Sequence, residues 1–224
     1  MSKVRFTEEE IVDSMQVVGL VPVFYHDRVD IAVQVLKCAY EAGVRSFEFT
    51  NRGANALNVF KELVNQGKRL NGLALGIGTI MNVQQAEAFL EVGADFIVSP
   101  MFKQEIATHC NRAKRLWIPG CATITEVVNA MDAGASLVKI FPASVLGPTF
   151  VSSVLPVIPT AKLMPTGGVE PTLENLTAWF KAGVTCVGIG SQLFSKESAQ
   201  DPSRLAMRVK TLIGTIDNIR KSKM

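Results

Sequence analysis

The sequence predicts an α/β fold, a (β/α)8 (TIM) barrel of parallel strands with an extra N-terminal helix. Eight apolar segments of strand length alternate with amphipathic segments of helical period. Several helical segments end in glycine, which closes a helix in the left-handed conformation at little steric cost. At 224 residues, the chain lies near the small end of the size range of this barrel. A doubly wound open sheet is the alternative fold.

The elements follow one another along the whole chain. The expected strands are VVGLVPVF (17–24), RSFEFT (45–50), LALGIGT (73–79), DFIVSP (95–100), LWIPG (116–120), SLVKIFP (136–142), KLMPTGG (162–168) and CVGIGS (186–191). The clearest helices are expected over residues 30–43, 56–67, 83–93 and 172–183. No linker or low-complexity segment divides the chain. Residues 1–224 are therefore expected to form a single barrel domain, with residues 1–16 as an N-terminal helical cap.

One pattern recurs at four helix ends, where a glycine, a valine or alanine, and a polar residue precede a strand. The glycines are Gly43, Gly93, Gly134 and Gly183. They precede the second, fourth, sixth and eighth expected strands. Alternate strands of a (β/α)8 barrel share the interior layers of side chains. Residues at one offset from these glycines should therefore lie in a common layer.

Five residues after each glycine, this register predicts two charged side chains facing each other across the barrel. The residues at this offset are Glu48, Val98, Lys139 and Gly188. Two residues nearer the C-terminal mouth, where active sites of this fold lie, are Thr50, Pro100, Phe141 and Gly190. A register shifted by one would turn every side chain to the other face. An outward-facing Lys139 would then lie under a helix, where an ammonium group is equally hard to accommodate.

A lysine in this position indicates covalent chemistry. Burial removes hydration from the ammonium form and lowers its pKa, and the neutral amine can form a Schiff base with a ketone. The cationic imine withdraws electrons from the adjacent carbon, so a carbon–carbon bond can be cleaved without a metal. Lys139 is therefore the candidate nucleophile and Glu48 its proton shuttle. The alternative is a structural Lys139–Glu48 ion pair, a weak stabiliser because desolvation offsets its attraction.

Residues near the ends of other strands predict how a substrate is held. Arg52, in EFTNR, can bind an α-keto acid carboxylate through two parallel hydrogen bonds, and Thr79, at the end of GIGT, can assist. Two glycine-rich stretches, PTGG (165–168) and GIGS (188–191), follow the seventh and eighth strands. Loops at these two positions are a recurrent phosphate site in this fold, because backbone N–H groups point at the anion.

Composition excludes several other classes of function. The formal charge is only +3 and the basic residues are scattered, so no nucleic-acid partner is expected. The N-terminal residues mix charges without an apolar core, and no apolar run approaches about 18 residues, so neither a signal peptide nor a membrane span is expected. With two histidines and no paired carboxylates at ligand spacing, no metal site is expected. The four cysteines are far apart and are typical of reduced thiols in a cytosolic protein: Cys38, Cys110, Cys121 and Cys186.

Taken together, EFTNR, GIGT, IPG, VKIFPA, MPTGG and VGIGS resemble, in order and over nearly the whole chain, the 2-keto-3-deoxy-6-phosphogluconate (KDPG) aldolases and the related 4-hydroxy-2-oxoglutarate (KHG) aldolases. The resemblance implies a cytoplasmic class I aldolase on a (β/α)8 barrel, a homotrimer that needs no cofactor. The implied substrate is a phosphorylated keto acid, KDPG, cleaved to pyruvate and glyceraldehyde 3-phosphate. Cleavage of 4-hydroxy-2-oxoglutarate to pyruvate and glyoxylate is a second implied activity, and the galactonate-derived isomer of KDPG is an alternative substrate.

The resemblance also implies a role for each candidate residue. Lys139 resembles the Schiff-base lysine of the family and Glu48 its proton shuttle. The other matching positions are Arg52 and Thr79 for the substrate carboxylate, Pro100 and Phe141 for the pyruvyl walls, Thr166 for the aldehyde or hydroxyl group, and Gly167, Gly168, Gly190 and Ser191 for the phosphate.

Two departures from the family pattern concern the distal end of the substrate. Met101 and Phe102 stand where many relatives have a glycine after the proline, so they are expected to reshape the mouth of the pocket. The residues SVLGP (144–148) replace an acidic, glycine-rich sequence of some members. Two other functions stay open. One is a phosphate-binding barrel isomerase or synthase in which Lys139 is only an electrostatic group, and the other is a non-enzymatic phosphosugar sensor.

Overall fold

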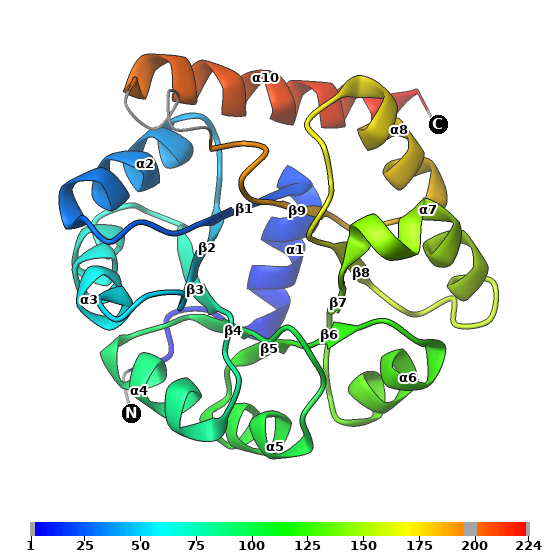
Figure 1. Ribbon diagram of the computed structural model, residues 1–224, viewed down its shortest axis with the longest axis horizontal. Helices are drawn as coiled ribbons and strands as arrows, with labels where there is room; N and C mark the ends of the chain where they lie inside the picture. Colours follow the sequence, from blue (N-terminus) through cyan, green and yellow to red (C-terminus); the bar gives the residue numbers. More distant parts are fainter. Residues whose placement is uncertain (1–2, 195–200, 223–224) are drawn as a thin grey trace.

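In the computed structural model, which describes residues 3–194 and 201–222, parallel strands form a ring surrounded by helices (Figure 1). The strands are β1 (Leu20–Phe24), β2 (Ser46–Thr50), β3 (Ala74–Gly78), β4 (Phe96–Val98), β5 (Leu116–Ile118), β6 (Gly120–Cys121), β7 (Val138–Ile140), β8 (Leu163–Pro165) and β9 (Val187–Ile189). The helices are α1 (Glu8–Val18), α2 (Val29–Glu41), α3 (Ala56–Gly67), α4 (Val83–Val92), α5 (Gln104–Ala113), α6 (Ile124–Asp132), α7 (Ala143–Val154), α8 (Leu173–Ala182) and α10 (Pro202–Lys221).

The ring closes through two groups of hydrogen-bonded strands. One has the order β5-β4-β3-β2-β1-β9 and the other the order β6-β7-β8. β5 and β6 are consecutive and are separated by Pro119, which has no N–H for the strand ladder, so the expected strand 116–120 is divided here. A bridge between Thr166 and Gly188 joins the end of β8 to β9. The (β/α)8 barrel prediction is confirmed, and the open-sheet alternative is wrong.

The N-terminal helix exists, but its bounds differ from the expected cap over residues 1–16. α1 covers Glu8–Val18, and the side chain of Thr7 caps its first turn. Residues 17–18, expected in the first strand, instead form the end of this helix. Gly19 ends it in the left-handed conformation with φ 75°, so β1 begins only afterwards.

The interior of the barrel is filled at its N-terminal end by α1, which crosses the ring in Figure 1. An inner hydrophobic cluster joins the apolar face of this helix to inward-facing strand residues. Its members are Ile11, Val12, Met15, Val21, Ala74, Phe96, Val98, Leu116, Ile118, Leu137, Met164 and Cys186. A second, larger cluster lies between the strands and the outer helices. Because α1 closes the bottom, the space for a ligand lies at the C-terminal ends of the strands.

The four repeated glycines set the register of the strands as predicted. Each has a φ between 94° and 111°, a region that glycine enters without steric cost. Val98 belongs to the inner cluster. Phe49 and Ile140, the immediate neighbours of Glu48 and Lys139, belong to the outer cluster. Since successive strand residues point to opposite faces, Glu48 and Lys139 point into the barrel, and the inward register is confirmed.

Candidate active site

Lys139 lies in the middle of β7 with its side chain inside the barrel, where only 5% of the residue is exposed. Its Nζ lies 4.9 Å from the centroid of the Phe141 ring. Among the described residues, no hydrogen bond or ion pair to this amine is formed. Burial lowers the pKa of Lys139, an effect that Glu48 opposes and Arg52 reinforces. The amine is therefore biased towards its neutral, nucleophilic form.

Glu48 lies on β2 and is 1% exposed. Its carboxyl group fills the space where a Cβ on Gly78 would lie, so glycine on β3 makes room for it. One carboxyl oxygen, Oε2, is buried without a hydrogen-bond partner. Burial raises the pKa of Glu48, against the lowering effect of the positive charges on Lys139 and Arg52. A buried carboxyl group with an unused oxygen and a raised pKa is suited to proton transfer with a bound molecule.

Lys139 and Glu48 act on each other's pKa but form no salt bridge. The ion pairs within 4.0 Å among residues 3–194 and 201–222 involve other side chains. A buried ion pair repays its desolvation only when its geometry is close and its remaining hydrogen bonds are satisfied. The purely structural ion pair is therefore not formed, and both groups are left to interact with a ligand between them.

Arg52 and Thr79 lie where the second and third strands open into loops. Arg52 is exposed, and within the described part of the chain its guanidinium group has no hydrogen-bond or ion-pair partner. Thr79 has a φ of 62°, a conformation that is strained for a β-branched residue. Such strained residues cluster at functional sites, where the surrounding structure holds them in position. Both side chains face the cavity that contains Lys139 and Glu48.

The opposite side of the cavity is formed by the ends of β8 and β9. Thr166 is buried, its hydroxyl has no hydrogen-bond partner, and it occupies the space that a side chain on Gly188 would need. Gly167 and Gly168 have φ values of 81° and 110°. Among the hydrogen bonds of the described residues, none uses the N–H groups of Gly167, Gly168 or Ser191 as donors. These N–H groups are available to an anion.

One cavity of about 430 Å³ at the C-terminal ends of the strands brings all the predicted site residues together. They come from six strands or the loops that follow them: Glu48, Arg52, Thr79, Pro100, Lys139, Phe141, Thr166, Gly167, Gly168, Gly190 and Ser191. The sequence therefore predicted the position of the cavity but only part of its lining. It did not single out several further residues that line it: Val23, Phe24, Tyr25, Val169, Gln192 and Phe194.

The residues that were missed lie in or directly after β1, after β8 and after β9. Tyr25 directly follows β1 and lies two residues after Val23, which lines the cavity; Phe24, between them, belongs to the outer cluster and also reaches the cavity. This spacing is a signal that could have identified Tyr25. Phe194 packs on Phe24, with ring centroids 4.8 Å apart. No local pattern predicts this contact, because it joins segments far apart in the sequence.

The two departures from the family pattern lie outside the lining of the cavity. Phe102 packs its ring on Trp117, with centroids 5.7 Å apart, and Met101 is half-buried. Neither residue is among those that line the cavity, and their effect on its mouth stays a prediction. The segment 144–148 lies in α7, which is kinked at Gly147.

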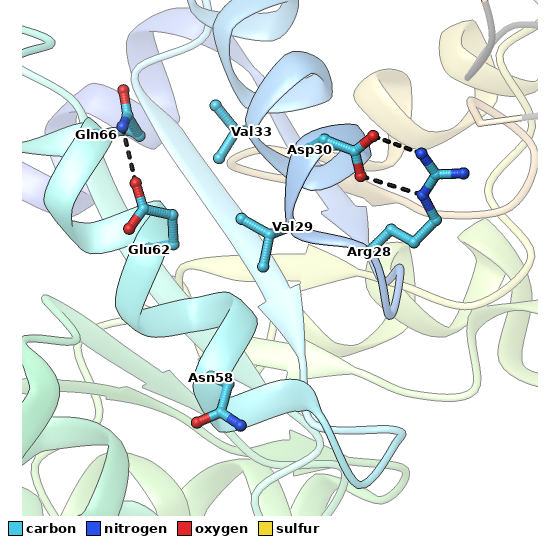
Figure 2. Close-up of a pocket in the computed structure, with 7 residues that line it drawn as sticks. All are labelled: Arg28, Val29, Asp30, Val33, Asn58, Glu62 and Gln66. Carbon is cyan, nitrogen blue, oxygen red and sulfur yellow. Dashed lines mark hydrogen bonds and ion pairs between the residues drawn. The ribbon is translucent and has the colours of Figure 1, made fainter.

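A larger but wide-open hollow of about 740 Å³ lies between α2 and α3 on the outside of the barrel (Figure 2). Figure 2 shows that its charged side chains are paired: Arg28 binds Asp30, and Gln66 binds Glu62. Its volume exceeds that of the inner cavity, yet it contains no buried, unpaired reactive group. The inner cavity is the better candidate site because it holds Lys139 and Glu48.

Two kinds of feature are absent from the part of the chain that the structure describes. No group of three or more histidine, cysteine or carboxylate residues that could hold a metal ion occurs there. No described helix combines the length and the apolar character needed to cross a membrane.

Comparisons with known proteins identify the family. The family model described as "KDPG and KHG aldolase" matches residues 11–207. The 2-dehydro-3-deoxy-phosphogluconate aldolase of Treponema pallidum (strain Nichols) is 34% identical over 170 residues, which cover 75% of this chain and 79% of the relative. The 2-dehydro-3-deoxy-6-phosphogalactonate aldolase of Escherichia coli (strain K12) is 34% identical over 140 residues, which cover 62% of this chain and 66% of the relative.

A solved structure agrees with these sequence matches. The KDPG aldolase of Zymomonas mobilis ZM4, crystallised with 3-phosphoglycerate, superposes with a TM-score of 0.79 and is 25% identical, covering 92% of this chain and 96% of that one. The family match extends over most of the barrel and includes every candidate site residue. The chain therefore belongs to the KDPG and KHG aldolase family, whose members are carbon–carbon lyases.

Proposed function

We propose that this chain is a class I aldolase that cleaves KDPG to pyruvate and glyceraldehyde 3-phosphate through a Schiff base on Lys139. The observation that carries the proposal is the buried, unpaired lysine that shares one cavity with the buried, unsatisfied carboxyl group of Glu48. A lysine used only to attract an anion works best when it is charged. A desolvated lysine with a lowered pKa is suited to nucleophilic attack instead.

The first half of the reaction builds the imine and breaks the carbon–carbon bond. The neutral Nζ attacks the C2 carbonyl carbon, and the carbinolamine loses water when Glu48 donates a proton to its hydroxyl group. The iminium then accepts the electron pair of the C3–C4 bond. At the same time, the Glu48 carboxylate takes the proton of the C4 hydroxyl group, and the aldehyde product leaves.

The second half returns the enzyme to its starting state. Glu48 gives its proton to C3 of the enamine, which restores the iminium. Water then hydrolyses the iminium to pyruvate and the free amine, and the proton released in this step returns to the Glu48 carboxylate. One carboxyl group alternately gives and accepts protons, so its pKa must lie closer to neutral than that of an exposed carboxylate. The raised pKa of Glu48 supports this role.

Arg52 and Thr79 are proposed to hold the carboxylate of the keto acid. The guanidinium group of Arg52 has no partner among the described residues, and its planar shape matches a carboxylate through two hydrogen bonds. Thr79 adds a hydroxyl group from the neighbouring strand. Pro100 and Phe141 are proposed as apolar walls around the pyruvyl group, since both line the cavity.

The distal half of the substrate is proposed to lie against the loops that follow β8 and β9. Thr166 has a free hydroxyl group for the aldehyde or hydroxyl end, and backbone N–H groups of Gly167, Gly168, Gly190 and Ser191 are proposed to bind the phosphate. The relative from Zymomonas mobilis was crystallised with a phosphorylated three-carbon acid, which supports a phosphorylated substrate.

The galactonate-derived isomer of KDPG is the second candidate substrate, because the relative from Escherichia coli acts on it at the same identity of 34% as the KDPG aldolase relative. KHG is a third. Pyruvate release from all three compounds, compared by kcat/KM, separates the candidates. We expect KDPG to give the highest value, and a clear preference for the galactonate isomer would overturn that assignment but not the chemistry.

The Schiff base is tested by reduction in the presence of pyruvate. We expect borohydride to add a reduced pyruvyl group to Lys139 alone, detected by intact mass and peptide mapping, and to inactivate the protein. The same treatment without pyruvate is the control. Turnover without trapping would favour an isomerase or synthase that uses Lys139 only electrostatically. Ligand binding with neither turnover nor trapping would favour a phosphosugar sensor.

The phosphate site gives a prediction on an exposed residue. Ser191→Asp is expected to lower kcat/KM for KDPG by at least about tenfold, because a carboxylate beside the phosphate adds like-charge repulsion. Activity on unphosphorylated KHG should change by less than about twofold, and Ser191→Ala, which keeps the backbone N–H, should be mild with both substrates. An equal loss on KDPG and KHG would contradict a phosphate site at Ser191.

We also propose a homotrimer that works in the cytoplasm, on the grounds of family membership. Analytical ultracentrifugation of the purified protein tests the first point. A monomer at micromolar concentration would overturn it. Fractionation of the source cells tests the second.

A further inference from the structure

Tyr25 lies at the mouth of the cavity and has no role in the function proposed above. It is part of a link, a chain of contacts that connects two neighbouring loops. Its hydroxyl group donates a hydrogen bond to the carboxylate of Asp27, two residues further along the loop between β1 and α2. This bond raises the pKa of Tyr25 to about 12, so the phenol stays protonated and remains a donor throughout the physiological range. Its ring packs against Phe49 on β2, with centroids 5.5 Å apart. Tyr25 is thereby fixed at both ends.

The link reaches the neighbouring loop between β2 and α3, which carries Arg52. The Nδ2 group of Asn55 donates a 2.8 Å hydrogen bond to the backbone oxygen of Asp27. The Tyr25 hydroxyl also occupies the space where a Cβ on Gly53 would lie, and that Cβ would come within 3.0 Å of the Asp27 carboxylate. The loop is thus packed at Gly53 and tied at Asn55, one and three residues after Arg52 in the sequence.

The side chain of Arg52 does not contribute to these contacts. It is exposed and has no partner among the described residues, so its own contacts do not fix the loop. Tyr25 and Arg52 both line the cavity, whereas Asp27, Gly53 and Asn55 do not. The ring of Tyr25 therefore separates the cavity from the hydrogen-bonded link behind it.

We propose that Tyr25 is a positioning residue: through its hydrogen bond to Asp27 it holds the loop of Arg52 so that the guanidinium group is preorganised for the substrate carboxylate. This inference rests on the proposed function, since it assumes that Arg52 binds the carboxylate of the pyruvyl half. Preorganisation of a binding group improves affinity by reducing the ordering cost of binding. Every substrate shares the pyruvyl half, so the effect should be equal for all of them.

The test measures the pyruvate concentration that gives half-maximal trapping by borohydride. Tyr25→Phe keeps the ring but removes the donor, and is expected to raise this concentration roughly three- to tenfold, the worth of one hydrogen bond. Asp27→Ala should do the same, whereas Asp27→Asn keeps an acceptor oxygen and should restore most of the affinity. KM for KDPG and KHG should rise by the same factor, with kcat little changed.

Tyr40 provides the matched control, because it is the only other tyrosine of the chain. Its hydroxyl donates a 3.1 Å hydrogen bond to the backbone oxygen of Asn71, and it does not line the cavity. Tyr40→Phe therefore removes an equivalent bond without touching the loop of Arg52. It should leave the half-saturating pyruvate concentration unchanged.

A double-mutant cycle separates positioning from direct contact with substrate. In an Arg52→Ala background, Tyr25→Phe should have no further effect on pyruvate affinity, because the group that it positions is gone. An undiminished effect in that background would show that Tyr25 contacts the ligand itself and would overturn the proposal, as would wild-type affinity in Tyr25→Phe. If the wild-type protein were not trapped by pyruvate at all, the proposed function would fail instead.

Discussion

Replacing Lys139 by methionine is expected to abolish trapping by pyruvate and to lower kcat/KM by a factor on the order of 10⁴ or more, as the loss of a covalent nucleophile does in other enzymes. Methionine has a similar length and shape but no amine, so the barrel interior stays filled. Steady-state assays with KDPG check the loss of activity. Reduction by borohydride in the presence of pyruvate checks the loss of trapping. Residual activity above about one hundredth of wild type would contradict an imine mechanism.

The same replacement is expected to stabilise the protein. The pKa of Lys139 is lowered in the folded state, so the unfolded chain binds more protons between that pKa and the ordinary value of 10.5. The free energy of unfolding of the wild type therefore rises with pH through this window. Below the window, the destabilisation caused by burying the protonated amine is fully present. Removing a buried ionisable group in favour of an apolar one gains about 1–4 kcal/mol in favourable cases.

The pH dependence makes the stability prediction specific. The excess stability of Lys139→Met, measured by urea unfolding, should be largest below the lowered pKa of Lys139 and should shrink as the pH approaches 10.5. Lys162, half-exposed and 3.9 Å from Asp13 at the other end of the barrel, gives the control. Lys162→Met should change both activity and stability little, by within about 0.5 kcal/mol for stability. A less stable Lys139→Met protein would mean that the lysine is charged and paired in the folded state.

The barrel and its cavity were predictable because both follow from local patterns. A glycine that ends a helix at positive φ fixes where the next strand begins, and the alternation of a strand then fixes which residues point inwards. Glu48 and Lys139 could therefore be assigned to the interior by counting from Gly43 and Gly134. The residues that follow the strands were found because a parallel barrel gathers all C-terminal strand ends at one mouth.

The errors and omissions have two causes, the position of a helix end and contacts between distant segments. Val17 and Val18 are apolar enough for a strand, but the helix continues until Gly19 ends it. The ring of Phe102 packs on Trp117, a contact that no spacing reveals. The link from Tyr25 to the loop of Arg52 depends in the same way on two loops meeting.

Glu48→Gln is the second change with a large expected effect. It keeps the shape of the side chain but cannot exchange protons, so kcat for KDPG should fall by about 10²–10⁴-fold, the usual range for a general acid–base group. The imine should still form, because the amine that attacks is unchanged. Prolonged incubation with pyruvate and borohydride should therefore label Lys139 fully, although more slowly than in the wild type.

The pH profile of that labelling distinguishes a proton shuttle from a group that only shapes the cavity. The negative charge of Glu48 raises the pKa of Lys139 against the effect of burial, so the glutamine variant should have a still lower lysine pKa. The labelling rate falls at low pH as the amine becomes protonated, and this fall is the acidic limb of the profile. In the glutamine variant the acidic limb should therefore move to lower pH, because the neutral amine persists there. Asp13→Asn, at the far end of the barrel, should leave both kcat and this limb unchanged. If Glu48→Gln lowered kcat without moving the acidic limb, the carboxyl group would be too far from the amine to exchange protons with its adducts.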